Sequence, residues 1–271
     1  MKTENQEIKL QYLCNNFRFH YSLERPTSLE PYYKHCHSCY ELYAFVDGEV
    51  DFIVESVSYN MKPFTILLIP PHKYHYANIL KLNKNYHRFT FLFNPNFLPE
   101  SITSSLENEV KMFTFNKENL KLFNHFNNIQ KALKQFDAKD KELFLSLFLC
   151  DILLDLKYSK NLVFSPISYI TNDAVCNILN FINEHIYEKL SVEIIAKKFY
   201  LSPVYISQIF SKTMHISLMR YIKQKKLLLA EDLIRNGDKP TNIASLLGYT
   251  NYSTFFRLYK KEFGYAPSDK I

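Results

Sequence analysis

Four side chains in the first third of the chain are of the types that bind transition metals, namely His35, His37, Glu41 and His75. On one uninterrupted strand, His35, His37 and Glu41 would point to the same face, because strand side chains alternate between faces. With His75 opposite, they could form a three-histidine, one-carboxylate site for iron, manganese, nickel or zinc. Hydrogen bonding between imidazole and carboxylate explains the same residues without an ion. We expect this second arrangement, and therefore no metal and no other cofactor.

A second group of informative residues belongs to a pattern that occurs twice after Leu190. The first copy contains Ile195-Ala196 and Tyr205-Ile206-Ser207, and the second contains Ile243-Ala244 and Thr254-Phe255-Phe256. Each copy predicts a helix, a tight turn and a second helix, which is the helix-turn-helix arrangement. Two such units favour DNA binding over two plain helical hairpins.

The second helix of each unit is expected to contact bases. Arg257 can donate two hydrogen bonds to guanine, Gln208 can pair with adenine, and Val204 and Phe256 can contact thymine methyl groups. Lysines such as Lys212 can bind phosphates without reading sequence. The predicted DNA contacts are Val204, Ser207, Gln208, Ser211, Lys212, Tyr252, Ser253, Phe256, Arg257 and Lys260.

Helix boundaries and spacing support this prediction. Ser191 is expected to cap a helix over Val192–Phe199, and Ser202 to cap the next one, with Pro203 in its first turn. Leu218–Arg235 is expected to form a long helix between the units and to hold the two reading helices apart. To enter successive major grooves, their centres must lie about 34 Å apart.

Composition agrees with a DNA-binding protein. The chain has 271 residues and a net charge of +6, and residues 161–271 hold 14 Lys+Arg against 9 Asp+Glu. A basic excess is expected where phosphates are met. Cys36 and Cys39 form a single CxxC, which is a weak zinc signal. The polar start lacks an export signal, and Leu143–Leu156 is too short to span a bilayer, so a cytoplasmic protein without membrane contact is expected.

The elements that must position these residues fall into an α+β fold. Short strands between Phe17 and Phe93 predict a sandwich or small barrel, with Asp47-Gly48 joining two antiparallel strands. Lys117–Phe136 and Lys139–Tyr158 predict a helical hairpin, and the second helix is apolar enough to pack on the barrel and form a dimer interface. The expected domains are 1–100 for effector binding, 101–160 for dimerisation, 161–172 as linker and 173–271 for DNA binding.

Residues 190–268 resemble the DNA-binding domain of AraC-type (AraC/XylS) transcription regulators over nearly its full length. The matching residues are Ile195-Ala196, Leu201-Ser202, Tyr205-Ile206-Ser207, Phe210, Ala230, Ile243-Ala244, Gly248-Tyr249, Phe255, Tyr259-Lys260-Lys261, Gly264 and Pro267-Ser268. The resemblance implies two helix-turn-helix subdomains that bind double-stranded promoter DNA and activate transcription with RNA polymerase. His215 stands where the family has glycine, and Lys226 replaces the family's linker-helix arginine.

The first half is similar to cupins. His35, His37 and Glu41, followed by Gly48, match the first cupin motif, and His75 matches the histidine of the second. The glycines of the second motif are absent. The resemblance implies a barrel that binds a small-molecule effector, with sugars as a frequent class, and the expected ligand-binding residues are His35, His37, Glu41, Tyr43 and His75.

Three functions are consistent with these features. The first is a dimeric, ligand-responsive activator of carbohydrate or other metabolic genes. The second is a metal-dependent cupin enzyme with an accessory nucleic-acid-binding domain. The third is a regulator without a small-molecule ligand. We expect the first, because no catalytic arrangement of residues stands out.

Overall fold

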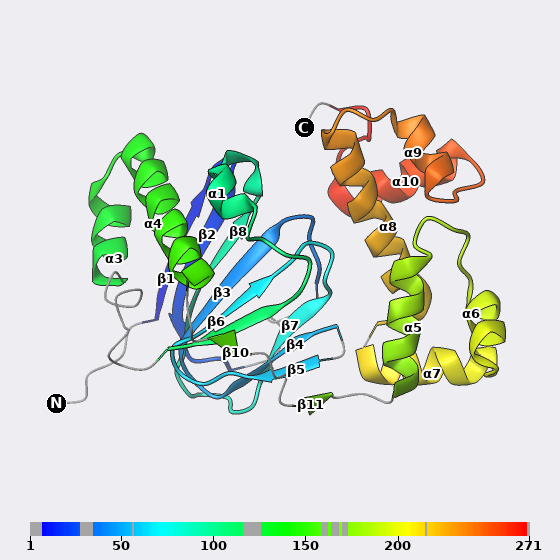
Figure 1. Cartoon of the computed structure of the whole chain (residues 1–271), viewed down its shortest axis with the longest axis horizontal. Coiled ribbons are helices and arrows are strands. Elements are labelled where there is room, and N and C mark those ends of the chain that lie inside the picture. Colours follow the sequence, from blue (N-terminus) through cyan, green and yellow to red (C-terminus); the bar gives the residue numbers. More distant parts are fainter. Residues whose placement is uncertain are drawn as a thin grey trace. The chain divides into compact units, whose positions relative to one another are not determined.

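The computed structural model describes residues 7–27, 35–55, 57–115, 126–158, 162–163, 168–169, 173–214 and 216–269. They form two compact units, one made mainly of residues before Ser168 and the other mainly of Ser168–Ile271 (Figure 1). The first contains most of the strands and the second is built mainly from helices, as expected for an α+β chain. Within the described ranges, no helix combines the length and hydropathy needed to cross a bilayer.

The first unit contains two antiparallel sheets. The seven-stranded sheet has the order β1-β2-β8-β3-β6-β9-β10, and the four-stranded sheet has the order β11-β5-β4-β7. The strands are β1 (Ile8–Leu13), β2 (Phe17–Glu24), β3 (Tyr40–Asp47), β4 (Val50–Val54), β5 (Val57–Asn60), β6 (Thr65–Ile69), β7 (His75–Ile79), β8 (Tyr86–Phe93), β9 (Lys111–Thr114), β10 (Leu162–Val163) and β11 (Ser168–Tyr169). Short helical turns follow β8 at η2 (Pro95–Phe97) and α1 (Glu100–Thr103).

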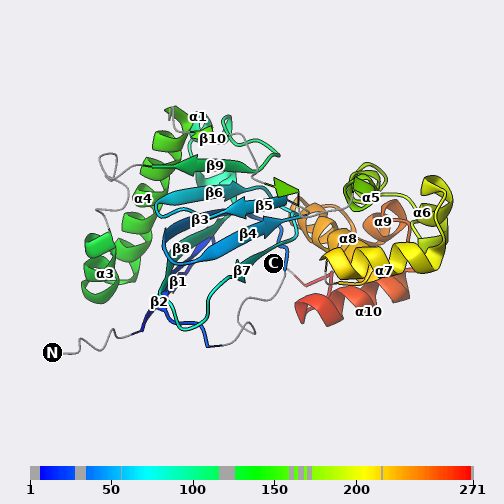
Figure 2. The same cartoon turned by 90° about the horizontal axis from the view of Figure 1, so that it is seen from below.

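Strand β8 shows why the two faces of the large sheet differ. Its alternate residues Phe89, Phe91 and Phe93 are at most 1% exposed. They belong to the main hydrophobic core, together with the buried side of α4 (Ala138–Tyr158). Helices α3 (Phe126–Gln135) and α4 lie on the same side of this sheet (Figure 2). The intervening β8 residues therefore face the opposite side, where the cavity described below lies.

The turn at Asp47-Gly48 corrects one expectation. It does not join two paired strands, because β3 pairs with β6 and β8 while β4 pairs with β7 in the other sheet. The turn instead carries the chain from one sheet to the other. Gly48 has a φ of +142°, and an added Cβ would lie 2.9 Å from the Asn85 carbonyl oxygen, so a side chain there is strained.

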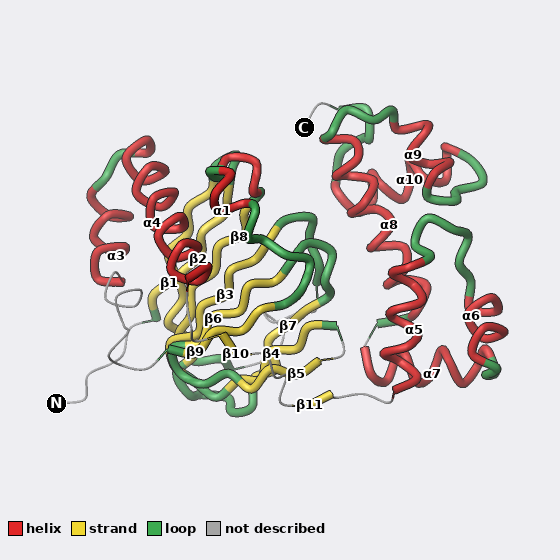
Figure 3. Tube along the Cα trace, in the orientation of Figure 1, coloured by secondary structure: helices red, strands yellow, loops and turns green. Residues whose placement is uncertain are grey.

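In the described residues, the second unit contains six helices besides the short strand β11 (Figure 3). They are α5 (Asp173–Glu184), α6 (Val192–Phe199), α7 (Pro203–Met214), α8 (Leu218–Arg235), α9 (Pro240–Leu246) and α10 (Tyr252–Phe263). Both predicted caps are confirmed, since Ser191 Oγ accepts from the Ile194 N–H at 3.3 Å and Ser202 Oγ from the Tyr205 N–H at 3.1 Å. The long helix α8 also has its predicted bounds.

Several expectations concern residues outside the described ranges. These are the first part of the helix expected over Lys117–Phe136, most of the segment 161–172 and the backbone conformation of His215. Two short stretches of that segment are described, and they are strands. Leu162–Val163 pairs with β9, and Ser168–Tyr169 pairs with β5.

Candidate functional site

A cavity of about 430 Å³ lies between the two sheets of the first unit. Its wall comes from β1, β2, β3, β8, β4 and β7 and from His35, and it collects side chains that alternate with those of the core. The lining residues are Gln11, Arg18, His20, His35, Glu41, Tyr43, Phe52, Tyr76, Ala77, Tyr86, Arg88, Thr90 and Leu92. Aromatic rings and hydrogen-bonding groups are mixed on this wall, as in pockets for small polar molecules.

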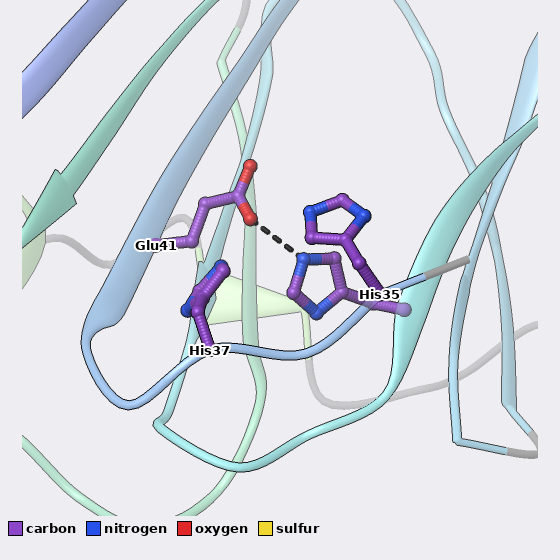
Figure 4. Close-up of side chains that lie close together, drawn as sticks. His35, His37 and Glu41 are labelled. Carbon is purple, nitrogen blue, oxygen red and sulfur yellow. Dashed lines mark ion pairs between the residues drawn. The ribbon is translucent and has the colours of Figure 1, made fainter. Parts of the chain in front are cut away.

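The three histidines and the glutamate expected to form a cluster do come together. Their candidate ligand atoms, from His35, His37, Glu41 and His75, all lie within 4.8 Å of one another. Figure 4 shows the side chains of His35, His37 and Glu41 pointing toward a common centre. Glu41 Oε2 lies 2.8 Å from His75 Nε2, and both side chains are buried.

The backbone that brings these residues together differs from the expected one. They do not lie on one uninterrupted strand, since β3 begins only at Tyr40. His35 instead forms an antiparallel bridge with His75, with N···O distances of 3.1 and 2.9 Å in the two directions. His37 lies in the irregular segment between this bridge and β3. The backbone bridge between His35 and His75 brings the cluster together, and not the alternation of side chains along a single strand.

The buried charged groups in the cavity wall are compensated. Arg88 Nη1 donates to Glu24 Oε1 at 2.6 Å, and its guanidinium lies 4.0 Å from the centre of the Tyr86 ring. The Tyr43 and Tyr86 hydroxyls are 2.7 Å apart, and burial raises the pKa of both phenols. Burial, together with the charge of Arg88, lowers the pKa of His20.

Three of the expected ligand-binding residues, His35, Glu41 and Tyr43, line the cavity, while His37 and His75 belong to the adjoining cluster. Arg88 and Tyr86 were missed from the expected set. Their signal was present, because they occupy the positions of β8 that alternate with the three phenylalanines.

In the first helix-turn-helix unit, α7 has one buried and one exposed side. Ile206 and Phe210 are fully buried, whereas Val204, Gln208 and Lys212 are exposed. The expected contacts Ser207 and Ser211 are half-buried, and the Ser207 hydroxyl donates to the Pro203 carbonyl at 2.9 Å.

In the second helix-turn-helix unit, α10 likewise has one buried and one exposed side. Phe255 and Tyr259 are fully buried in a core with Ile243, Ala244 and Leu247. On the outer side, the structure places Ser253, Arg257 and Lys260 as exposed and Tyr252 and Phe256 as half-buried. The Asn251 side chain caps the helix by accepting from the Thr254 N–H at 2.8 Å. An exposed cation on a rigid, capped helix can contact a duplex.

Lys226 has a structural role that the sequence did not indicate. It is buried on α8, and its Nζ donates to the Glu188 carbonyl at 2.5 Å and to the Leu247 carbonyl at 2.6 Å. Glu188 precedes the first helix-turn-helix unit, and Leu247 is the C-cap of α9, the first helix of the second. The ammonium group therefore ties both units to α8 and is turned away from solvent, so it is not a candidate DNA contact.

The two helix-turn-helix units differ at the equivalent turns between their helices. Tyr200 ends α6 in the left-handed conformation, with φ 55° and ψ 38°, and its side chain is 96% exposed. Gly248 follows α9 with φ +74°, and an added Cβ would lie 3.3 Å from backbone atoms of Glu188 and Lys189. Glycine accommodates this conformation without strain, whereas tyrosine does not.

Comparison with known proteins finds family models that match both compact units of the chain. A family model described as "AraC-like ligand binding domain" matches residues 25–148, and one described as "Helix-turn-helix domain" matches residues 195–270. Regulatory protein SoxS of Salmonella typhimurium is 38% identical over 93 residues, which are 34% of this chain and 87% of SoxS. SoxS of Escherichia coli K12 is 36% identical over 94 residues, 34% of this chain and 88% of that protein.

Solved structures match as well. ToxT of Vibrio cholerae O395 covers 94% of this chain and 96% of its own, with 15% identity and a TM-score of 0.38. The C-terminal domain of AraT from Geobacillus stearothermophilus covers 35% of this chain and 81% of its own, with 26% identity and a TM-score of 0.34. The SoxS likeness spans most of that protein, and the ligand-binding model covers β3 to β9 and part of α4 in the sheet-containing unit. The chain therefore belongs to the AraC family of helix-turn-helix transcription regulators, carries an AraC-like ligand-binding domain, and is a ligand-responsive DNA-binding regulator and not an enzyme.

Proposed function

We propose that the chain activates metabolic genes by binding promoter DNA with both α7 and α10, under the control of a neutral polar effector of the sugar class. The observation that supports this most is the pair of capped helices with matching exposed sides in one domain. Activation would take place through contact with RNA polymerase at the promoter.

For the DNA contacts, we propose the residues expected from the sequence, Val204, Ser207, Gln208, Ser211, Lys212, Tyr252, Ser253, Phe256, Arg257 and Lys260. Gln208 on α7 and Arg257 on α10 are both exposed. This supports one base-contacting side chain from each helix-turn-helix unit, each in its own major groove. Lys212 and Lys260 lie one helical turn further along, where phosphate contacts would set the register.

The effector class follows from the charges in the cavity. Arg88 is paired with Glu24, and Glu41 is paired with His75, so the buried charges of the wall are compensated within the protein. A charged ligand would have to break one of these pairs, unless it paired with Arg18, the exposed cation of the wall. A neutral molecule with several hydroxyl groups can instead hydrogen-bond to the wall and stack on its rings, and a volume of about 430 Å³ suits a small sugar.

We also propose a homodimer formed through α4. Leu143, Leu147 and Leu154 lie on one side of this helix and are 59%, 61% and 39% exposed. Exposed leucines repeated at this spacing form an apolar stripe, which is a common mark of a protein interface. Leu147→Glu should convert a dimer to monomer in sedimentation, while Lys141→Glu, elsewhere on the helix, should not; equal behaviour of the two variants would exclude α4.

The effector proposal is tested with the full chain and a panel of neutral sugars and of matched sugar acids. A neutral sugar is expected to raise the unfolding temperature and to change the affinity for promoter DNA, because a ligand can act only by its difference in affinity for the two states. Tyr86→Phe should weaken both effects. Stabilisation by the acids alone would contradict the neutral class.

A further inference from the structure

A second and smaller cavity, of about 180 Å³, lies on the face of the large sheet that packs against α4. Its floor comes from β6 and β9. Leu68 pairs with Lys111 across these strands, so the two side chains point to the same face, and Phe113 shares that face two positions further along β9. This cavity has no lining residue in common with the cavity between the sheets, so the two are separate sites.

The other walls of the smaller cavity come from the last two turns of α4 and from the segment that follows α1. Leu153 and Leu156 are buried on α4, and Leu106, after α1, is half-buried against the same core. The two walls are joined by a hydrogen bond, which Lys157 Nζ donates to the Ser101 carbonyl at 2.6 Å. Together with the floor, these leucines give the cavity an apolar lining.

The rim of the smaller cavity is positively charged. Lys111 Nζ lies 2.7 Å from Glu107 Oε1, and this pair lies towards solvent, because the Glu107 side chain is 58% exposed. The stem of Lys111 then covers apolar surface while its ammonium group stays at the rim. The ammonium group of Lys157 bonds to a backbone carbonyl, which carries no formal charge and does not neutralise it. The lining therefore holds two cations against one carboxylate.

We propose that the smaller cavity binds a small carboxylate with an apolar body, either an aromatic ring or a short alkyl chain. A cavity of about 150 Å³ lined by leucine, isoleucine and phenylalanine stays free of water and binds benzene. Here a floor of the same kind has a similar volume, so it favours a ring or an alkyl chain over water. The excess positive charge at the rim favours a carboxylate head group over a cationic one.

Such a ligand would contact β9, α4 and the segment after α1 at the same time. These three parts come together only in the folded chain, so the ligand binds the folded state and raises its stability. The site lies outside the cavity proposed for the effector. The proposal therefore does not depend on the proposed function.

The test is a titration of the full chain with para-fluorobenzoate, without effector or DNA, followed by fluorine NMR. Saturable binding is expected, together with a rise in unfolding temperature. The cation para-fluorobenzylamine has the same ring and should bind at least about tenfold more weakly, because attraction to the rim becomes repulsion. Lys157→Gln should weaken binding of the carboxylate about fivefold, the upper end for an exposed ion pair. Leu106→Trp should abolish binding, because the indole ring would fill the cavity, and its unfolding temperature shows whether it is folded.

Lys139→Gln is the matched control, since it removes the same charge from the same helix outside the cavity. Its affinity for para-fluorobenzoate should equal that of the unaltered protein. Three results would overturn the proposal, namely an unchanged fluorine signal, equal affinity for the two probes, or equal affinity in Lys157→Gln and Lys139→Gln. Loss of binding in Arg18→Gln alone would assign the carboxylate to the larger cavity and would overturn it too. Neither effector nor DNA takes part, so failure of the proposed regulation would leave this result intact.

Discussion

Replacing Lys226 with methionine should destabilise the DNA-binding unit far more than the loss of an ordinary lysine. Methionine keeps most of the apolar stem and removes the ammonium group, so the Glu188 and Leu247 carbonyls both lose their charged donor. Hydrogen bonds to a charged group contribute about 1.5–3 kcal/mol each. Their sum is an upper limit, because burying the ammonium has a cost of its own.

That cost is visible in the structure, since burial lowers the pKa of Lys226. The charged form is thus less favourable in the folded chain than in water, which offsets part of the hydrogen-bond energy. We expect Lys226→Met to lower the free energy of unfolding of this unit by about 2–3 kcal/mol. Lys226→Arg should recover part of the loss, because a guanidinium can donate to two carbonyls.

The measurement is hydrogen exchange in increasing urea, followed on peptides from α8 and α9 of the full chain. Lys223→Met is the control, because Lys223 lies on the same helix and is exposed. Its effect should stay within about 0.5 kcal/mol, as for most surface substitutions. If Lys226→Met costs no more than Lys223→Met, the two carbonyl contacts do not stabilise the domain.

Two further predictions concern backbone strain and pH. Tyr200→Gly should raise the free energy of unfolding by about 0.5–1 kcal/mol, because glycine adopts the left-handed conformation without strain. Gly248→Ala should lower the free energy of unfolding by about 1–2 kcal/mol, because it introduces a side chain at a positive φ. Urea titration checks both, and a loss of stability in Tyr200→Gly would refute the strain argument. The pKa of His20 is lowered by burial, so the folded state binds this proton less readily than the unfolded state. The contribution of neutral His20 to stability is fully present above about pH 6.5 and is lost as the pH falls through the lowered pKa. His20→Gln should therefore reduce the drop in unfolding temperature between pH 7.5 and pH 5.5. An unchanged drop would show that other groups control it.

Local patterns in the sequence were enough to predict most helices and several strands. The caps at Ser191 and Ser202 involve residues three positions apart, and the bounds of α8 follow from its periodicity. The alternating phenylalanines of β8 correctly indicated a strand with one face on a core. Each of these depends on neighbours in the chain.

What the sequence could not predict depends on contacts between distant residues. The bridge from His35 to His75 crosses 40 positions and replaces the single strand that was expected. Arg88 finds Glu24 only because β8 pairs with β2, and the side chain of Lys226 finds two carbonyls whose positions are set by packing. Sequence spacing alone carries no information about such partners.

The central claim is that two helices of one chain read two separate stretches of DNA. Selection of bound sequences from a random duplex pool, at physiological salt, tests it most directly. The full chain should enrich two conserved blocks centred about one helical turn apart, about 10–10.5 base pairs. Gln208→Ala should erase preference in one block and Arg257→Ala in the other, each costing about 1–3 kcal/mol at the affected position. Enrichment of a single block, or equal loss of both blocks in either variant, would contradict the account.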